Sequence, residues 1–387
     1  MKKYIVGSVL ILGLTVIAIA ITAYKQPLQF IQVSSPPTFV KAWGIEGSGN
    51  SQFKNPSGIA TDSLGNVYVI DSGNYRVEKF SSDGVYQKDW TCGNPGSVTT
   101  GITINDNDRI IVTFGDLDPE TPGAVGISKT NGQLLNSMAL HAKDKTLDEE
   151  LGYPQGVAAG QGWDVFIATN YHVVKFNSSN FNLIQSWGGK GAGIGKFDQI
   201  KGVAVGPKGN VYVVDANNHR IQKFDSNGNY LTKWESKGSG AGQFLEPKGI
   251  TVDTAGNVYV TDIENDCIQK FDSNCEFITK WGEIGEENGE FDNPHDIAVH
   301  SGSIYVADTS NHRIQKFQSY MFSAPLRIIK EHTLTTIKSP TPQPPAPTST
   351  TTLSPVIEPK APDEQLTPTT STVLTTTTTR QIRRFQR

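Results

Sequence analysis

The sequence predicts an all-β domain in which six similar four-stranded units form a closed ring. Related segments begin at spacings of 43, 55, 46, 47 and 47 residues. Each well-preserved copy has four short runs of β-branched and aromatic residues separated by Gly, Asn and Asp, which indicates four antiparallel strands joined by tight turns. A period of about 40 to 50 residues with four strands is typical of one propeller blade. The sequence therefore predicts a six-bladed β-propeller.

The fourth copy, residues 202 to 234, shows the repeating unit most clearly. Its expected strands are GVAV, VYVVD, RIQKF and YLTKW, and turn residues lie between them in GPKGN, ANNH and DSNGN. Copies 58–90 and 249–281 have the same pattern, whereas the copies that begin at Gly101 and Gly156 keep less of it. We expect every copy to form one antiparallel blade of four strands.

The segment TFVKAWG, residues 38 to 44, is expected to close the ring. The sixth copy runs from Asp296 to Phe317 and lacks the outer strand that ends in Trp in other copies. Residues 38 to 44 have the character of such a strand and precede the first complete copy. Pairing this strand with the last copy removes an open sheet edge with unpaired backbone groups. The blade-end tryptophans are then Trp43, Trp90, Trp187, Trp234 and Trp281.

Residues 1 to 24 are predicted to be a membrane-targeting segment. Residues 5 to 23 carry no charge, and as a helix they would extend about 28 Å, close to the roughly 30 Å of a bilayer's hydrocarbon layer. Lys2 and Lys3 precede them, which favours a propeller on the far side of the membrane. We favour a single-pass signal anchor at the cell membrane. The alternative is a cleaved secretory signal ending near Ala18-Ile19-Ala20, which would leave the protein secreted.

Residues 25 to 37 are then a linker, residues 38 to 321 the propeller, and residues 322 to 387 a tail. From 335 to 379 the tail is mostly Thr, Pro and Ser and has no aromatic residue. Such a composition buries too little apolar surface to fold, so we expect a disordered Thr/Pro-rich stalk. The basic end, RQIRRFQR, is expected to be solvated.

Several recurring sequences, GNVYVxD, NxR[VI]xKF and the linker GSGxGQFxxPxG, resemble the NHL repeat family. The matching residues are Asp71, Asn74 and Arg76; Asp215, Asn218 and Arg220; and Asp308, Asn311, His312 and Arg313. The resemblance covers residues 39 to 317 and is specific for blades one, four, five and six. Blade three has Thr169 and His172 where the family has Asp and Arg, and blade two has almost none of the pattern. The family implies a six-bladed propeller.

The repeated Asp and Arg are expected to be structural. Asp and Arg five residues apart across a turn suit an Asx turn held by an ion pair. Since they recur blade by blade, we interpret them as scaffold residues rather than catalytic residues. They are Asp71, Arg76, Asp215, Arg220, Asp262, Asp308 and Arg313.

The residues at the beginning of each first strand are expected to surround a central channel. They are Ser57, Thr100, Gln155, Lys201, Lys248, His295 and Asp296. Propeller enzymes similar to this fold, the amidating lyase and the virginiamycin-type lyases, place several channel histidines on a metal, whereas this ring has one histidine. A divalent site needs about three or more convergent ligands, and Lys201 and Lys248 would repel a cation. We therefore expect a polar channel without a cofactor, with a calcium or zinc ion as the weaker alternative.

Two irregular loops, 115–123 and 141–154, are candidates for ligand binding. Both are expected on the same face of the propeller and could form one acidic lobe. A calcium site is the alternative to solvated charge there, because carboxylate oxygens are abundant. The residues are Asp116, Asp118, Glu120, Asp144, Asp148, Glu149 and Glu150.

The overall charge disfavours nucleic acid as a partner. Residues 39 to 321 contain 23 Lys and Arg against 34 Asp and Glu, whereas binding to phosphates depends on cationic contacts. No nucleophile elbow, phosphate-binding loop or zinc-protease motif occurs in the sequence. The leading hypothesis is a non-enzymatic module that recognises a protein or glycan through its loops. The alternative is a lyase or lactone hydrolase with a divalent metal in the channel.

Overall fold

The computed structural model describes residues 35–93, 97–116, 124–139 and 153–319. They belong to the first of two units into which the chain divides, Met1–Pro325 and Leu326–Arg387. The predicted segments 1–24 and 322–387 lie outside the described residues, and so does most of the linker 25–37. Within the described ranges, no helix is long and apolar enough to cross a membrane.

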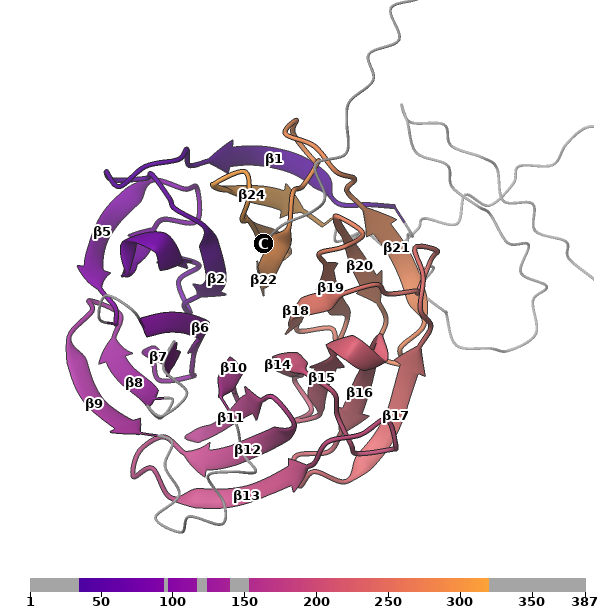
Figure 1. Ribbon diagram of the computed structural model, residues 1–387. Helices are drawn as coiled ribbons and strands as arrows, with labels where there is room; N and C mark the ends of the chain where they lie inside the picture. Colours follow the sequence, from indigo (N-terminus) through magenta and orange to yellow (C-terminus); the bar gives the residue numbers. More distant parts are fainter. Residues whose placement is uncertain (1–34, 94–96, 117–123, 140–152, 320–387) are drawn as a thin grey trace, which may run out of the picture. The chain divides into compact units, whose positions relative to one another are not determined.

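Six four-stranded antiparallel sheets surround a central axis (Figure 1), which confirms the six-bladed propeller. Their strands, from the axis outward, are as follows. Blade one has β2 (Pro56–Thr61), β3 (Val67–Asp71), β4 (Arg76–Phe80) and β5 (Tyr86–Thr91). Blade two has β6 (Ser97–Ile104), β7 (Arg109–Asp116), β8 (Ala124–Lys129) and β9 (Leu134–Ala139). Blade three has β10 (Pro154–Ala159), β11 (Asp164–Thr169), β12 (His172–Asn177) and β13 (Leu183–Gly188).

The remaining blades follow the same order. Blade four has β14 (Ile200–Val205), β15 (Val211–Asp215), β16 (Arg220–Phe224) and β17 (Tyr230–Glu235). Blade five has β18 (Pro247–Val252), β19 (Val258–Asp262), β20 (Cys267–Phe271) and β21 (Phe277–Trp281). Blade six has β22 (Pro294–His300), β23 (Ser303–Asp308), β24 (Arg313–Gln318) and, outermost, β1 (Thr38–Trp43). Short 3-10 turns, η1 (Ser72–Asn74) and η2 (Ala216–Asn218), follow β3 and β15.

The predicted closure of the ring is confirmed. β1 pairs with β24 in antiparallel register, from Thr38 opposite Gln318 to Trp43 opposite Ile314. Blade six therefore combines three strands from the end of the domain with one from its beginning (Figure 1). The pairing leaves the sheet edge of β24 covered, as the sequence predicted.

The hydrophobic core lies between neighbouring blades, and the blade-end tryptophans connect them. The Trp43 ring lies 6.2 Å from the Tyr305 ring of its own blade and 5.8 Å from the Phe80 ring of blade one. Trp187 repeats this arrangement with Phe166 at 6.2 Å and Phe224 at 5.8 Å. Aromatic rings at these centroid distances contribute beyond the area that they bury. The outer strands of blades six and three thus pack against the following blade as well as their own.

The propeller has two different faces, which the strand order defines. The linker face carries the connections between blades and the loops that join second to third strands, so every inner strand begins there. The hairpin face carries the turns between first and second and between third and fourth strands. The domain both begins and ends at the hairpin face, where the Thr38 hydroxyl donates to the Gln318 carbonyl at 3.4 Å.

Candidate functional site

The repeated Asp and Arg form buried ion pairs at the linker face. Arg76 Nε contacts Asp71 Oδ2 at 2.8 Å, and its Nη2 donates to the carbonyls of Gly49 and Gln52 at 2.8 and 2.7 Å. Asp71 also accepts the backbone N–H of Lys54 at 2.6 Å. Asn74 Nδ2, within the same turn, donates to Asp71 Oδ2 at 2.7 Å. The carboxylate therefore connects its own turn to the linker between blades, but it makes no side-chain cap to a backbone N–H of the turn, so the expected Asx turn is not formed. The pair fixes the linker in place.

The same arrangement recurs in blades four and six. The Arg220 Nε to Asp215 Oδ2 distance is 2.6 Å, and the Arg313 Nε to Asp308 Oδ2 distance is 2.7 Å. In blade five Cys267 replaces the arginine, and Asp262 accepts the N–H groups of Leu245 and Glu246 instead. These contacts support the scaffold interpretation of the repeated residues.

Blade three replaces the ion pair with a shorter contact. The Thr169 hydroxyl donates to the His172 carbonyl and accepts the His172 N–H, both at 3.2 Å. The departure that the sequence showed at these two positions is thus accommodated by a local side-chain to backbone bond.

The predicted acidic lobe is largely outside the described residues. Asp116 ends β7 at the linker face. The other candidates are not part of the described chain: Asp118, Glu120, Asp144, Asp148, Glu149 and Glu150.

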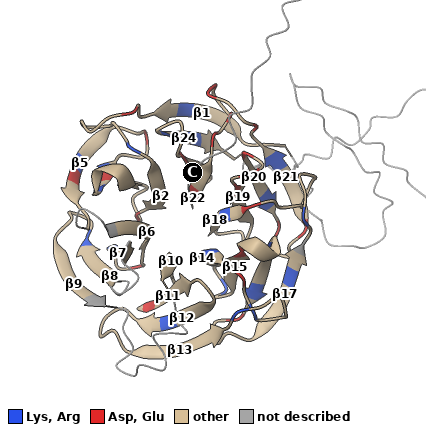
Figure 2. Ribbon diagram, in the orientation of Figure 1, with Lys and Arg blue, Asp and Glu red and all other residues tan. Residues whose placement is uncertain are grey.

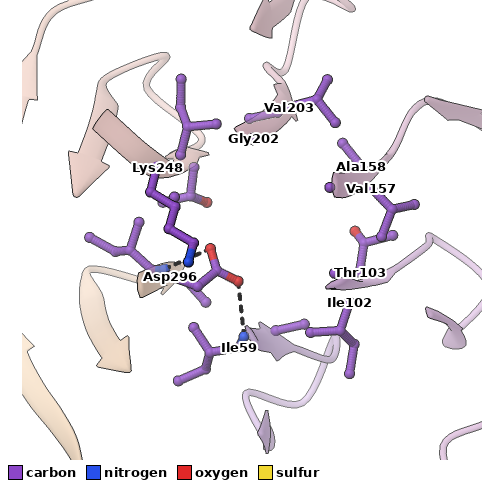
Figure 3. Close-up of a pocket in the computed structure, with 18 of the residues that line it drawn as sticks. Ile59, Ile102, Thr103, Val157, Ala158, Gly202, Val203, Lys248 and Asp296 are labelled. Carbon is purple, nitrogen blue, oxygen red and sulfur yellow. Dashed lines mark hydrogen bonds between the residues drawn. The ribbon is translucent and has the colours of Figure 1, made fainter. Parts of the chain in front are cut away.

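A central cavity of about 220 Å³ lies between the six inner strands (Figure 3). All seven residues of the predicted channel ring line it: Ser57, Thr100, Gln155, Lys201, Lys248, His295 and Asp296. Because they lie near the beginning of the inner strands, they form the channel mouth at the linker face. Deeper in the channel, the lining consists mainly of Ile, Val, Ala and Thr.

The neutral polar residues of the mouth are bonded to their own blades. The hydroxyl of Ser57 pairs with that of Ser72. Thr100 Oγ1 contacts Thr113 Oγ1 at 3.0 Å, and Gln155 Nε2 donates to Asn170 Oδ1 at 3.1 Å. These three side chains therefore have structural partners within the loops and strands that carry them.

Charged residues of the inner strands occur in three adjacent blades only. β2, β6 and β10 carry none, whereas β14 carries Lys201, β18 carries Lys248, and β22 carries Asp296 (Figure 2). One half of the channel wall is therefore charged and the other half is neutral.

Lys248 and His295 are in direct contact at the mouth. The Lys248 ammonium lies 2.9 Å from His295 Nδ1 and 3.1 Å from Nε2. Burial, with the nearby Lys201 charge, lowers the Lys248 pKa to about 8. Burial and the two lysines lower the His295 pKa to about 3. His295 is therefore neutral near pH 7, and one ring nitrogen accepts a Lys248 proton while the other is a donor.

Asp296 occupies a position that is glycine in the other five blades. Its Oδ2 accepts the N–H of Ile59 in blade one at 3.0 Å, and its Oδ1 accepts the N–H of Ile297 at 2.9 Å (Figure 3). Burial raises the Asp296 pKa to about 7. This side chain therefore connects blades six and one across the ring closure, a role that the sequence analysis did not identify.

The residues of the mouth do not fit a divalent metal centre. Both Asp296 oxygens accept backbone N–H groups, and the Lys248 ammonium lies against the His295 ring. A cation at this position would also lie close to Lys201 and Lys248. Across the described residues, no group of three or more His, Cys, Asp or Glu side chains is arranged to bind a metal ion.

Glu78 is a further buried carboxyl group, at a position that is glutamine in blades four, five and six. In blade four the equivalent Gln222 donates to the Lys196 carbonyl at 2.8 Å and to Asp215 Oδ2 at 3.1 Å. Glu78 has no amide hydrogens to donate in this way. Its Oε1 lies 2.5 Å from Arg76 Nη2, and its Oε2 accepts the Ser51 N–H at 3.0 Å. Burial nevertheless raises its pKa to about 7. Comparing RVEKF in blade one with RIQKF in blades four and six would have revealed it.

Known proteins resemble this chain at the level of repeat and fold. The NHL repeat model matches residues 53–80, 197–224, 244–271 and 291–317. A search of curated proteins gave no match. A Bacteroides thetaiotaomicron protein of unknown function has a TM-score of 0.55 at 17% identity over 72% of this chain and 76% of its own.

Two further solved structures have similar folds. An auxiliary nutrient binding protein from Bacteroides thetaiotaomicron has a TM-score of 0.54 at 14% identity over 72% of this chain and 71% of its own. A streptogramin B lyase has a TM-score of 0.51 at 15% identity over 72% of this chain and 98% of its own. At such low identities these similarities establish the architecture alone. The chain therefore contains four NHL repeats, and the six four-stranded sheets form a β-propeller.

Proposed function

We propose that the protein is a non-enzymatic binding module that recognises a protein or glycan through its linker face. In this proposal it acts outside the cytoplasm, anchored by residues 5–23, or secreted where this segment is cleaved. The observation that carries the proposal is the position of the two ends of the domain. Thr38 and Gln318 lie opposite each other at the hairpin face, away from the channel mouth.

This position leaves the linker face free when the protein is tethered at either end. The linker face carries the channel mouth and the 3-10 turns. The loop from β7 to β8 and the connection from β9 to β10 both begin and end at this face. A rigid scaffold that presents irregular loops on one face is a common arrangement for recognition. A partner at this face would not compete for space with a membrane anchor or a tail.

The alternative of a metal-dependent lyase or lactone hydrolase has less support. Its metal would need ligands at the channel mouth, where His295 and Asp296 are already engaged with Lys248 and with backbone N–H groups. The similarity to a lyase structure, at 15% identity, extends only to the fold.

The test compares the two faces within blade four. Asn217 is exposed at the linker face and Asn227 is exposed at the hairpin face. In a Cys275→Ser background, Asn217→Cys and Asn227→Cys are each coupled to polyethylene glycol, and the full-length protein is applied to a glycan array and to purified surface proteins. The polymer at position 217 is expected to abolish binding of the identified ligand, and the polymer at 227 to leave it unchanged. Equal effects at the two positions would contradict the proposal.

A further inference from the structure

We propose that the channel mouth is an anion site in which Lys201 and Lys248 bind the carboxylate of a small organic acid. This site is distinct from the loops of the linker face. The proposal therefore stands or falls independently of whether that face recognises a protein or glycan.

The channel mouth carries two lysines. Of the groups on the inner strands, Lys201 and Lys248 are the basic ones, and Asp296 is the acidic one. Both Asp296 oxygens already accept backbone N–H groups. In the described part of the chain, neither lysine has a carboxylate within salt-bridge distance. Two partly buried ammonium groups without a carboxylate partner are costly, and a bound anion would offset this cost.

The two lysines also supply hydrogen-bond donors. The Lys248 ammonium lies 2.9 Å from His295 Nδ1 and 3.1 Å from its Nε2, so both ring nitrogens face this lysine. Lys248 has further ammonium protons beyond the one that this contact uses. The mouth therefore offers donors from two lysines to an oxyanion, and charge-assisted hydrogen bonds of this type are the stronger ones.

The cavity is small. Its volume of about 220 Å³ is below the roughly 300 to 1,000 Å³ of pockets for drug-sized ligands. Beyond the mouth, the side chains of Ile59, Ile102, Val157 and Val203 are buried in the cores between blades, so polar groups provide most of the surface that the cavity presents. A compact carboxylate with a short carbon chain fits a polar cavity of this size.

The experiment measures binding of butyrate and of inorganic phosphate to the full-length protein by isothermal titration calorimetry. We expect butyrate to bind, and Lys201→Met and Lys248→Met each to weaken it by about tenfold or more. Lys208→Met is the matched control, because Lys208 is exposed in a turn of the hairpin face. Phosphate binding as tight as butyrate binding would overturn the assignment to a carboxylate. Absence of butyrate binding, or equal weakening by Lys208→Met, would overturn the site.

A second measurement uses the wild-type protein and does not depend on the folding of a variant. An amine-specific reagent is applied with and without butyrate, and modification of each lysine is followed by mass spectrometry. Butyrate is expected to slow the modification of Lys201 and Lys248 and to leave that of Lys208 unchanged. Unaltered modification of both channel lysines at saturating butyrate would contradict the proposal.

Discussion

Trp43 lies directly opposite Ile314 in the antiparallel pairing of β1 with β24. These residues come from the two ends of the propeller, and their strands are held together by hydrogen bonds and packing alone. The Trp43 ring also reaches Phe80 in blade one. A single strand therefore completes blade six and packs against its neighbour.

Deletion of residues 38 to 44 is expected to abolish cooperative folding, since it exposes the edge of β24 and removes Trp43 from the core between blades six and one. Deletion of residues 335 to 387 is expected to leave thermal unfolding unchanged. Circular dichroism of the two truncated proteins provides the measurement. Similar unfolding curves for both would show that the closing strand is dispensable.

Trp43→Ala is expected to lower the free energy of unfolding by about 3 kcal/mol, because it leaves a cavity beside Tyr305 and Phe80. Trp163→Ala is the control, since the Trp163 side chain is 40% exposed, and it should cost much less. Urea unfolding of both variants measures the difference. Equal losses of unfolding free energy in the two variants would contradict a special role of Trp43 in the packing between blades six and one.

Glu78→Gln is expected to stabilise the protein at about pH 8. The folded-state pKa of Glu78 is raised from 4.5 to about 7, so the folded protein holds this proton more tightly than the unfolded chain. The contribution of Glu78 to stability is therefore largest below about pH 4.5 and is lost as the pH rises to about 7. Glutamine supplies the donor at every pH, as Gln222 does in blade four.

The gain from Glu78→Gln should be of the order of 2 to 3 kcal/mol at about pH 8 and should largely disappear at about pH 4.5. Denaturant titrations at both pH values check this prediction. Gln222→Glu in blade four is the reverse variant and should introduce the opposite pH dependence. A gain from Glu78→Gln that is independent of pH would exclude the protonation of Glu78 as its cause.

Arg220→Met is expected to destabilise the protein by about 3 to 5 kcal/mol, because it leaves the buried Asp215 carboxylate without its ion pair. It also removes donors to the carbonyls of Ala192, Gly193 and Lys196. Lys237→Met removes an exposed positive charge from the next linker and should have little effect. Thermal unfolding of both variants provides the comparison.

Butyrate binding at the channel mouth should weaken as the pH rises from about 7 to about 9. Lys248 loses its charge around its lowered pKa of about 8, and Asp296 gains charge around about 7. The Lys201 charge also lowers the Lys248 pKa, whereas the charges of Glu246 and Asp296 raise it. His295, which contacts Lys248, stays neutral over this pH range. Calorimetry across this range checks the prediction, and affinity that rises with pH would contradict it.

The blades were predictable because alternating apolar residues and turn residues are local signals. Even blade two, with almost none of the repeat motif, forms its four strands, because Ile110, Val112, Val125 and Ile127 still supply a buried apolar face. The seven residues of the channel mouth were also predictable, since position within an inner strand determines which residues reach the axis.

The roles of Asp296 and Glu78 were not predictable in the same way. Asp296 bonds to Ile59, which lies 237 positions away in the sequence, and its effect depends on the register of two blades that meet only when the ring closes. Glu78 differs from its counterparts by one functional group, and its raised pKa arises from burial that Arg76 and the Ser51 N–H only partly offset. Such effects can be predicted only when the three-dimensional neighbours of a residue are known.

The antiparallel pairing of Thr38 with Gln318 also determines how the domain responds to mechanical tension. Both ends of the propeller leave from the same end of the β1–β24 ladder. Opposing forces on the two ends would therefore open the ladder one residue pair at a time, in an unzipping geometry, instead of loading all its hydrogen bonds together in shear. A protein stretched between an anchor and a distant attachment would thus open at its closing strand at low force.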